Sequence, residues 1–540
     1  LAETFHTDLA FGTGGMRGVM GVGTNRINSY TLGKNTQGVS NYLHQQFADK
    51  EEISVAVAFD CRRNSQYLAN VVAEVFSANN ISVKLFPSLR PTPLLSYAVK
   101  YFNCQCGIVL TASHNPPEYN GYKVYWEDGG QLVPPQDKEI IAEINALKFS
   151  DIKFDKKTEK IDVLDDQVDQ AFIKESIEKG SFHLNDNTDN RENLNIVFTP
   201  LHGTSVVINP KVLKQAGYTK LHIVEEQAEP DSEFSTVKSP NPEEPEALKM
   251  ALDLAEKKNA DIVIGTDPDG DRLGVAVRNK NGEMTLLNGN QAMVLMTWFL
   301  LDQQGKLKGN EYIASTIVST PMMKQLADHY QVDYHETLTG FKWIADLIKR
   351  HPDDHFIGGG EESFGFMVGD FVRDKDAATA TLLICELAAY LKAQGSGVYE
   401  KLLELYTEVG CYQEKLVALV KKGIQGAEEI RQKMENLREN PLQEIDGEKV
   451  IILEDYEKQM SFDIENKQES AIEIPQSNVL IYHTASGTKI CARPSGTEPK
   501  IKFYISVNGE LENTSEYEKV KDRLEKKVQR ITGELGITKE

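Results

Sequence analysis

The sequence predicts an α/β protein of three similar mixed α/β domains and a smaller C-terminal α+β domain, arranged around a central cleft. Short apolar runs alternate with amphipathic stretches, which is the order of strands and helices in layered α/β folds. Several apolar runs end in a polar or glycine-rich loop, and ligands bind at such strand ends in open α/β sheets. At roughly 100–200 residues per domain, the 540 residues correspond to about three to five domains.

The first domain is expected over residues 1–190. Its predicted elements are the strand Ile53–Phe59, the helix Tyr67–Asn79 and the strands Ile81–Phe86 and Cys106–Leu110. The last of these strands continues directly into Thr-Ala-Ser-His-Asn-Pro-Pro. The segment Asp151–Glu192 is charged and rich in Asn and Asp, so we expect the first domain to end there.

The same arrangement recurs in the expected second domain (191–289) and third domain (290–408). The predicted elements are the strands Leu194–Phe198, Asp261–Gly265, Tyr312–Val318 and Phe356–Gly358 and the helix Pro210–Ala216. The expected fourth domain (409–540) has a charged helix at Lys421–Glu439 and a linker-like turn at Pro441. A strand at Ile501–Val507 and a closing charged helix complete it.

Composition and charge narrow the class of protein. With 40% hydrophobic and 26% charged residues, the chain is typical of globular proteins. A formal net charge of −22 disfavours nucleic acid and anionic membranes as partners. A small anionic substrate would need a locally positive site, and the loops described below carry the Arg and Lys residues for one.

Six scattered cysteines without a Cys-x-x-Cys pair give no support for zinc ribbons or thioredoxin-like chemistry. A reducing, cytoplasmic location fits them best. No segment approaches the roughly 18–20 apolar residues that span a bilayer, and no signal peptide opens the chain. Because the first residue is Leu1, we expect the natural start to lie upstream.

Ser113 directly follows a predicted buried strand, in the loop Thr111–Pro117. A serine nucleophile needs a base or electrostatic help with a phosphate, and His114 and Lys123 lie nearby in sequence. The alternative is a turn capped by Ser and Asn side chains. Gly-x-Ser-x-Gly is absent, which does not support a hydrolase elbow.

The loop Asp267-Pro-Asp-Gly-Asp-Arg272 places three carboxylates between two apolar runs. Carboxylate oxygens are suitable ligands for Mg²⁺, and a cation would relieve the repulsion among them. A calcium loop of the EF-hand type would need Glu at its twelfth position, counted with Asp267 as the first, where Arg278 stands. The position at a strand end favours a metal site over a solvated acidic turn.

Three further loops carry polar or charged groups. Gly358–Gly365 offers two carboxylates and a hydroxyl for sugar hydroxyls, or it is a flexible loop without a ligand. Arg493-Pro-Ser-Gly-Thr-Glu-Pro499 combines a guanidinium, hydroxyls and a glycine, which suits a phosphate. In Gly12–Gly18 the third glycine of a dinucleotide loop is replaced by Arg17, so a phosphate contact is the better interpretation.

Taken together and in this order, the five loops resemble those of the α-D-phosphohexomutase superfamily, of the phosphoglucomutase/phosphomannomutase type. The resemblance extends from about Phe11 to Val507. It implies four domains around a cleft, in agreement with the elements above. Phe-Gly-Thr-Gly-Gly-Met-Arg-Gly and Thr-Gly-Phe-Lys-Trp resemble the branch that includes phosphopentomutases.

The resemblance also implies roles for individual residues. Ser113 would carry the transferable phosphate, and the metal ligands would be Ser113, Asp267, Asp269 and Asp271. Arg17 and Arg272 would stabilise the transferring group, Lys123 would be the general acid/base, and His114 would assist. The expected substrate-binding residues are Thr339, Glu361, Ser363, Lys375, Arg493, Ser495, Gly496, Thr497 and Lys502.

The implied activity is that of an isomerase that interconverts glucose 1-phosphate and glucose 6-phosphate through a phosphoserine and a bisphosphorylated sugar. Mg²⁺ is the expected cofactor, a sugar 1,6-bisphosphate the activator, and a small sugar phosphate the partner of a monomer or homodimer. Mannose phosphate and ribose or deoxyribose phosphate remain alternative substrates, because such loops discriminate by modest energies. A sugar phosphatase and a catalytically silent sugar-phosphate sensor are more distant alternatives.

Overall fold

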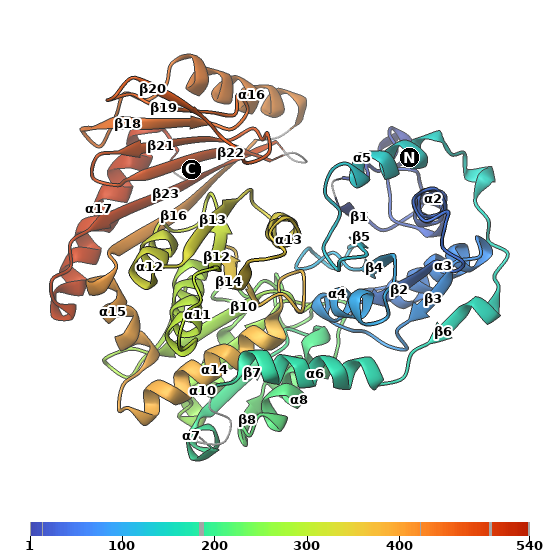
Figure 1. Ribbon diagram of the computed structural model, residues 1–540, viewed down its shortest axis with the longest axis horizontal. Coiled ribbons are helices and arrows are strands. Elements are labelled where there is room, and N and C mark those ends of the chain that lie inside the picture. The colour runs from blue at the N-terminus through green and yellow to red at the C-terminus, as the bar shows by residue number, and fades with distance from the viewer. Residues whose placement is uncertain (1, 13, 183–187, 422, 496–498, 538–540) are drawn as a thin grey trace. The chain divides into compact units, whose positions relative to one another are not determined.

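The computed structural model describes residues 2–12, 14–182, 188–421, 423–495 and 499–537, and it divides into two compact units (Figure 1). One unit comprises Leu1–Ala314 and Gly340–Tyr399, and the other comprises Ser315–Thr339 and Glu400–Glu540. The segment Ser315–Thr339 thus packs with the C-terminal part of the chain.

The first sheet has six strands in the order β1-β5-β4-β2-β3-β6. Its strands are β1 (Gly15–Val19), β2 (Ser54–Phe59), β3 (Ser82–Leu85), β4 (Cys106–Leu110), β5 (Tyr119–Trp126) and β6 (Ile161–Val163). The strands β4, β2, β3 and β6 are parallel, whereas β5 and β1 pair antiparallel. Because β2 and β4 are parallel neighbours, the residues that follow them, Asp60 and Thr111, lie at the same edge of the sheet.

Helices cover both faces of this sheet. The helices of this part of the chain are α1 (Ala2–Phe5), α2 (Ser29–Gln46), α3 (Ser65–Ala78), α4 (Thr92–Tyr101), α5 (Gln136–Ala146) and α6 (Gln167–Gly180), with short 3₁₀ helices at Phe149–Asp151 and Thr158–Lys160. Those that pack on the sheet are α2, α3 and α4. Asn28 caps α2, since its side chain accepts from the N–H groups of Tyr30 and Thr31. A Cβ at Gly107 of β4 would meet Val99 and Leu95, which places α4 against one face.

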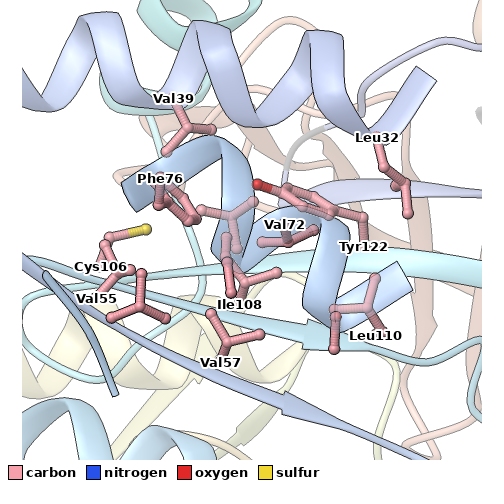
Figure 2. Close-up of a cluster of buried hydrophobic side chains, with 14 of the residues drawn as sticks. Leu32, Val39, Val55, Val57, Val72, Phe76, Cys106, Ile108, Leu110 and Tyr122 are labelled. Atoms are coloured by element: carbon pink, nitrogen blue, oxygen red, sulfur yellow. The ribbon is translucent and has the colours of Figure 1, made fainter. Parts of the chain in front are cut away.

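The other face of the first sheet forms an apolar core with α2 and α3 (Figure 2). Val55, Val57 and Ile108 of the central strands are fully buried. Figure 2 shows them opposite Val39 of α2 and Phe76 of α3. Burial of apolar area at about 25 cal/mol per Å² makes this layer a rigid base for the loops at the sheet edge.

The second sheet has five strands in the order β11-β10-β9-β7-β8. Its strands are β7 (Asn195–Thr199), β8 (Lys220–Ile223), β9 (Ile262–Thr266), β10 (Leu273–Arg278) and β11 (Met284–Leu287). Its helices are α7 (Thr188–Asn193), α8 (Asn209–Gln215), α9 (Glu225–Ala228) and α10 (Lys249–Lys258), with a 3₁₀ helix at Thr204–Val207. β9 is entirely buried and pairs antiparallel with β10, so the loop between them leaves the sheet as a tight connection.

The third part of the chain alternates helices and strands. They are α11 (Gly289–Gln303), β12 (Glu311–Thr316), α12 (Met322–Tyr330), β13 (Asp333–Thr337), α13 (Phe341–Arg350), β14 (His355–Glu361), β15 (Gly365–Val368), α14 (Ala377–Ala393) and α15 (Val398–Glu408). β14 and β15 pair antiparallel, with Glu361 opposite Gly365. Asp376 caps the buried helix α14 by accepting from the N–H groups of Ala378 and Thr379.

The C-terminal part is dominated by an eight-stranded sheet in the order β16-β23-β22-β21-β18-β19-β20, with β17 paired to β18. Its strands are β16 (Cys411–Val420), β17 (Glu444–Ile445), β18 (Glu448–Asp455), β19 (Met460–Asp463), β20 (Gln468–Ala471), β21 (Leu480–Thr484), β22 (Lys489–Pro494) and β23 (Lys500–Gly509). The helices are α16 (Gly423–Glu439) and α17 (Tyr517–Glu534), with a 3₁₀ helix at Thr514–Glu516.

Most predicted elements are present, with ends displaced by a few residues. The helix expected at Tyr67–Asn79 is α3, and the strand expected at Asp261–Gly265 is β9. The linker-like turn expected at Pro441 leads instead into β17, β18, β19 and β20, which were not predicted. β19 and β20 are half-buried or exposed throughout, whereas β18 has an apolar centre, which was an available signal. Among the described residues, no helix combines the length and the apolar character needed to cross a bilayer.

Candidate active site

Ser113 lies in the loop that follows β4, and its backbone has a φ of +52°, in the left-handed region. Thr111 stabilises this turn, because its hydroxyl accepts from the N–H of Ser113 at 2.9 Å. The Ser113 hydroxyl donates to Oδ2 of Asp267 at 2.9 Å, and Nδ1 of His114 lies 3.1 Å from Oγ of Ser113. The nucleophile candidate of the first domain and the acidic loop of the second therefore meet directly.

The acidic loop connects β9 to β10, and all three of its aspartates are buried. Oδ1 of Asp267 accepts from the backbone N–H groups of Asp271 and Arg272 at 3.1 and 3.0 Å. One carboxylate oxygen from each aspartate lies within 4.8 Å of the other two. Gly270 adopts a φ of +69°, which allows the tight turn between the last two carboxylates.

These carboxylates fit a bound divalent cation. Oδ1 of Asp269 and Oδ1 of Asp271 are buried without a hydrogen-bond partner, an arrangement that costs free energy unless a ligand supplies one. Burial, together with the charges of Asp269 and Asp271, raises the pKa of Asp267 well above its ordinary value. Hard oxygen ligands of this kind suit Mg²⁺, and a cation would remove both penalties.

Two lysines reach the same carboxylates. Nζ of Lys123, on β5, lies 2.7 Å from Oδ2 of Asp269 and 3.3 Å from Oδ2 of Asp271. Nζ of Lys375 lies 3.2 Å from Oδ2 of Asp271 and 3.2 Å from Oδ1 of Asp374. Burial disfavours both ammonium groups, but the facing carboxylates outweigh it and raise the pKa of each lysine. Both lysines are therefore protonated in this site and can act as proton donors.

His114 contacts Ser113, and the charges of Arg17 and Arg272 act on His114. Arg17 is exposed on β1, and its Nη1 donates to Oδ1 of Asn115 at 2.6 Å. Arg272 forms an ion pair with Glu243, while its buried Nε has no hydrogen-bond partner. Burial and the positive charges of Arg272 and Arg17 lower the pKa of His114 to about 2, so the imidazole is neutral.

The predicted sugar loop lies beside the acidic loop. The N–H of Leu273 donates to the carbonyl oxygen of Phe364 at 2.9 Å, and the backbone of Arg272 pairs with that of Gly365 in a single antiparallel β-bridge. Glu361, at the end of β14, is buried, and Ser363 stands in the turn before β15. The negative charge of Glu361 acts on both Arg272 and Lys375.

Six predicted substrate-binding residues belong to the unit that contains the C-terminal sheet, and the structure describes four of them. Thr339 ends the segment Ser315–Thr339, and its hydroxyl is buried without a hydrogen-bond partner. Arg493 of β22 stands opposite Lys502 of β23. The N–H of Ser495 donates to the carbonyl oxygen of Lys500 at 2.7 Å. Gly496 and Thr497 lie outside the described residues.

A cavity of about 620 Å³ adjoins Arg493 and Ser495 within that unit. Ile430, Arg431 and Met434 of α16 form part of its wall. The charged helix predicted at Lys421–Glu439 therefore borders the predicted phosphate loop, a role that its sequence alone does not indicate.

The sequence interpretation missed Thr92, Asp374 and Glu243. The N–H and hydroxyl of Thr92, at the start of α4, donate to the carbonyl oxygen and Oδ2 of Asp269 at 2.8 and 3.1 Å. Asp374 holds Lys375, and Glu243 pairs with Arg272. Thr92 follows Pro91 in a Pro-Thr-Pro sequence that starts a helix, and this was the available signal.

Comparison with known proteins agrees with this geometry. Family models for α/β/α domains I, II and III of phosphoglucomutase/phosphomannomutase match residues 8–151, 170–282 and 288–408. A phosphoglucomutase of Staphylococcus aureus (strain MRSA252) is 39% identical over 511 residues, which cover 94% of this chain and 90% of that protein. A phosphoglucomutase of Staphylococcus haemolyticus (strain JCSC1435) is 38% identical over 509 residues, covering 94% and 91%.

Solved structures share the fold at lower identity. A phosphoglucomutase/phosphomannomutase family protein of Burkholderia thailandensis superposes with a TM-score of 0.70 at 16% identity, covering 98% of both chains. The phosphoglucomutase parafusin of Paramecium, in an open form, gives 0.69 at 18% identity, covering 96% of this chain and 95% of that one. The chain therefore belongs to the phosphoglucomutase/phosphomannomutase family, within the α-D-phosphohexomutase superfamily, and is a mutase of the isomerase class.

Proposed function

We propose that the protein is a cytoplasmic phosphoglucomutase, which interconverts glucose 1-phosphate and glucose 6-phosphate through a phosphoserine at Ser113. The single observation that carries the proposal is the 2.9 Å contact between Oγ of Ser113 and Oδ2 of Asp267, inside a buried cluster of three carboxylates. The phosphoglucomutase relatives at 38–39% identity support glucose phosphate as the substrate.

We assign Asp267, Asp269 and Asp271 to Mg²⁺, with an oxygen of the Ser113 side chain or its phosphate as a further ligand. When bound, the ion neutralises negative charge on the transferring phosphoryl group. Arg17 and the Nε of Arg272, which has no hydrogen-bond partner, are suited to the remaining phosphoryl oxygens. Phosphoryl transfer depends chiefly on such positioning and charge neutralisation.

Lys123 and Asp267 are assigned to the two protons, and the neutral imidazole of His114, 3.1 Å from Oγ of Ser113, assists by orienting that hydroxyl. When Ser113 takes the phosphoryl group from a bisphosphorylated sugar, the Oγ–P bond forms and the sugar O–P bond breaks. The Lys123 ammonium gives its proton to the sugar oxygen, and the Ser113 hydroxyl proton passes to Oδ2 of Asp267, to which it already donates at 2.9 Å and whose pKa is raised by burial and by the neighbouring carboxylates. The opposite half-reaction returns both protons and leaves the phosphoryl group on the other sugar hydroxyl.

The remaining residues are assigned to the sugar and its second phosphate. Glu361 and Ser363, together with Lys375 and Thr339, are suited to the sugar hydroxyls and the ester. The non-transferring phosphate is assigned to Arg493, Ser495, Gly496, Thr497 and Lys502. Between half-reactions the bisphosphate must reverse its orientation, and a sugar 1,6-bisphosphate is accordingly the expected activator.

A coupled assay tests this proposal, with Mg²⁺, a trace of glucose 1,6-bisphosphate and glucose 1-phosphate, followed by the appearance of the 6-phosphate. The Ser113→Ala variant should lose turnover by at least about 10³-fold, because no phosphoryl carrier remains. Ser150→Ala, on an exposed 3₁₀ helix, is the matched control and should keep full activity.

The substrate is ranked in the same assay, with mannose and ribose phosphates as competitors. If kcat/KM were higher for mannose phosphate or ribose phosphate than for glucose phosphate, that sugar phosphate would be the preferred substrate in place of glucose phosphate. Release of inorganic phosphate by the wild type, or full activity in Ser113→Ala, would contradict the mutase and favour a phosphatase.

A further inference from the structure

Arg62 is a buried cation that none of the assignments above uses. It follows β2, and its side chain has no exposed surface. Its Nη2 donates to the carbonyl oxygen of Ser113 at 2.6 Å and also to that of Asn115. Its Nη1 donates to the carbonyl oxygens of Pro116 and Tyr119 at 2.8 and 3.0 Å. One guanidinium thus binds four backbone carbonyl groups of the loop that carries the proposed nucleophile.

The guanidinium is itself held on two further sides. Its Nε lies 3.2 Å from Oδ2 of Asp60, whose carboxylate is also fully buried. Oδ1 of Asp60 accepts from the N–H of Arg62 at 2.9 Å and from the Ser65 hydroxyl at 2.7 Å. The ring of Phe234 packs against the guanidinium, with 5.1 Å between Cζ of Arg62 and the ring centroid. Burying an ion pair costs desolvation free energy, so a contribution to stability does not by itself explain this arrangement.

We propose that Arg62 is a positioning residue for phosphoryl transfer, and this inference rests on the proposed mutase function. Ser113 has a φ of +52°, a conformation that non-glycine residues adopt only when the surroundings impose it. Arg62 imposes it by fixing the carbonyl groups at 113, 115, 116 and 119. The Ser113 hydroxyl is thereby kept against Asp267, although Arg62 itself cannot touch the substrate.

Only arginine matches this site. The two Nη groups each bind two acceptors while Nε faces Asp60, which uses the planar fork of the guanidinium. Lysine would keep the charge beside Asp60 but offers a single point donor. Arg62→Lys therefore separates charge from geometry, and the loop should lose its fixed conformation while the buried ion pair remains.

The experiment compares Arg62→Lys with Arg63→Lys. Arg63 is the next residue and also an arginine, but its side chain is 55% exposed and pairs with Glu233 on the surface. Arg62→Lys should lower kcat by 10- to 100-fold with KM for glucose 1-phosphate within about twofold, because loop misplacement weakens the transition state more than ground-state binding. Arg63→Lys should keep both constants within about twofold.

A second readout does not depend on turnover. Amide hydrogen exchange of a peptide that spans residues 111–123 should be at least tenfold faster in Arg62→Lys, and unchanged in Arg63→Lys, with exchange in β9 and α10 as the internal reference. Phe234→Leu removes only the ring that packs on the guanidinium, and should lower kcat about threefold. It provides the test if Arg62→Lys does not fold.

The outcomes separate the two proposals. Unchanged kcat and unchanged loop exchange in a folded Arg62→Lys would overturn the positioning role. If that variant does not fold, wild-type kcat in Phe234→Leu would overturn it. Loss of kcat that merely follows the fraction of folded protein would also overturn it, because that is a structural effect. Absence of mutase turnover in the wild type, with the exchange difference intact, would instead contradict the proposed function.

Discussion

Asp269 shows how one side chain serves two kinds of partner. Its Oδ2 accepts from Lys123 and from the Thr92 hydroxyl, at 2.7 and 3.1 Å, whereas its Oδ1 is buried without a hydrogen-bond partner. Burial favours the neutral acid, but the Lys123 ammonium and the hydrogen bonds outweigh it, and the pKa of Asp269 is held below its ordinary value. The carboxylate is therefore charged and ready for a cation over the whole working pH range.

Mg²⁺ should stabilise the wild-type protein and not Asp269→Asn. A ligand that binds only the folded state raises the melting temperature, by roughly 5 °C when its concentration is a hundredfold above Kd. Differential scanning fluorimetry with increasing MgCl₂ measures the effect. Asp253→Asn, which changes an exposed aspartate on α10 of the same domain, should keep the full shift. An equal shift in Asp269→Asn would contradict the metal site.

At this scale the sequence predicted the residues of the motifs but not those that support them. Ser113 and Asp267 each follow an apolar strand, which is a local signal. Thr92 and Arg62 act on residues that are 177 and 51 positions away, at contacts created by the docking of two domains and of two neighbouring strands. Such contacts depend on tertiary structure, which short-range patterns do not report. The roles of Lys123, His114 and the substrate residues stay predictions.

The segment 200–204, which follows β7, packs against the acidic loop and fixes its position. The N–H of Thr204 donates to the carbonyl oxygen of Pro268 at 2.8 Å, and a Cβ on Gly203 would lie 2.4 Å from Cα of Pro268. Backbone meets backbone here, so the neighbour cannot move away cheaply. The two strand-end loops of the second sheet form one rigid assembly.

Gly203→Ala should therefore displace the acidic loop. We expect a loss of about 2 kcal/mol in stability, typical of overpacking, and a loss of activity above tenfold. Gly533→Ala is the matched control, because a Cβ there meets nothing within 4 Å and lies in the helix α17. That control should gain about 0.5–1 kcal/mol from helix propensity. Thermal unfolding and the mutase assay measure both, and wild-type behaviour in Gly203→Ala would refute the clash.

Prediction of whole elements succeeded where burial is complete. β4 and β9 are continuous apolar runs with every residue buried, which is the strongest signal a strand can give. β19 and β20 are half-buried or exposed throughout, and their polar sequences resemble a linker. These strands exist because the C-terminal sheet continues past its core, so their own sequences do not specify them.

On the scale of the whole molecule, one buried carboxyl group makes the stability of a single compact unit depend on pH. Glu414 of β16 and Thr320 both belong to the unit with the C-terminal sheet, and the Thr320 hydroxyl is a hydrogen-bond partner of the Glu414 carboxylate. Burial raises the pKa of Glu414 to about 7, from an ordinary value of 4.5. The folded state thus holds a proton that the unfolded state has released between these pH values.

The stability of this unit should fall as pH rises from about 4.5 to 7, because in that window the folded form binds more protons than the unfolded form. The stabilisation from Glu414 is complete below pH 4.5 and lost above about 7. Glu414→Gln should remove this slope and add on the order of 1–2 kcal/mol above pH 7. Calorimetric melting of the wild type and of Glu414→Gln between pH 4.5 and 8 measures how the stability of each depends on pH.

Glu469→Gln, on the exposed strand β20 of the same sheet, is the control and should melt as the wild type does at every pH. A slope that persists in Glu414→Gln would show that another group titrates in this window. Because the protein carries a net charge of −22, the comparison should be made at constant ionic strength.

The contact between Ser113 and Asp267 also sets an order of events during synthesis. The two residues are 154 positions apart, so at about 5–20 residues per second the ribosome needs roughly 8 to 30 seconds to deliver the aspartate after the serine. During that interval the nascent first domain has no acidic cluster. Under the proposed mechanism, the first phosphate must therefore be acquired after the second domain has been made, from a sugar bisphosphate already present in solution.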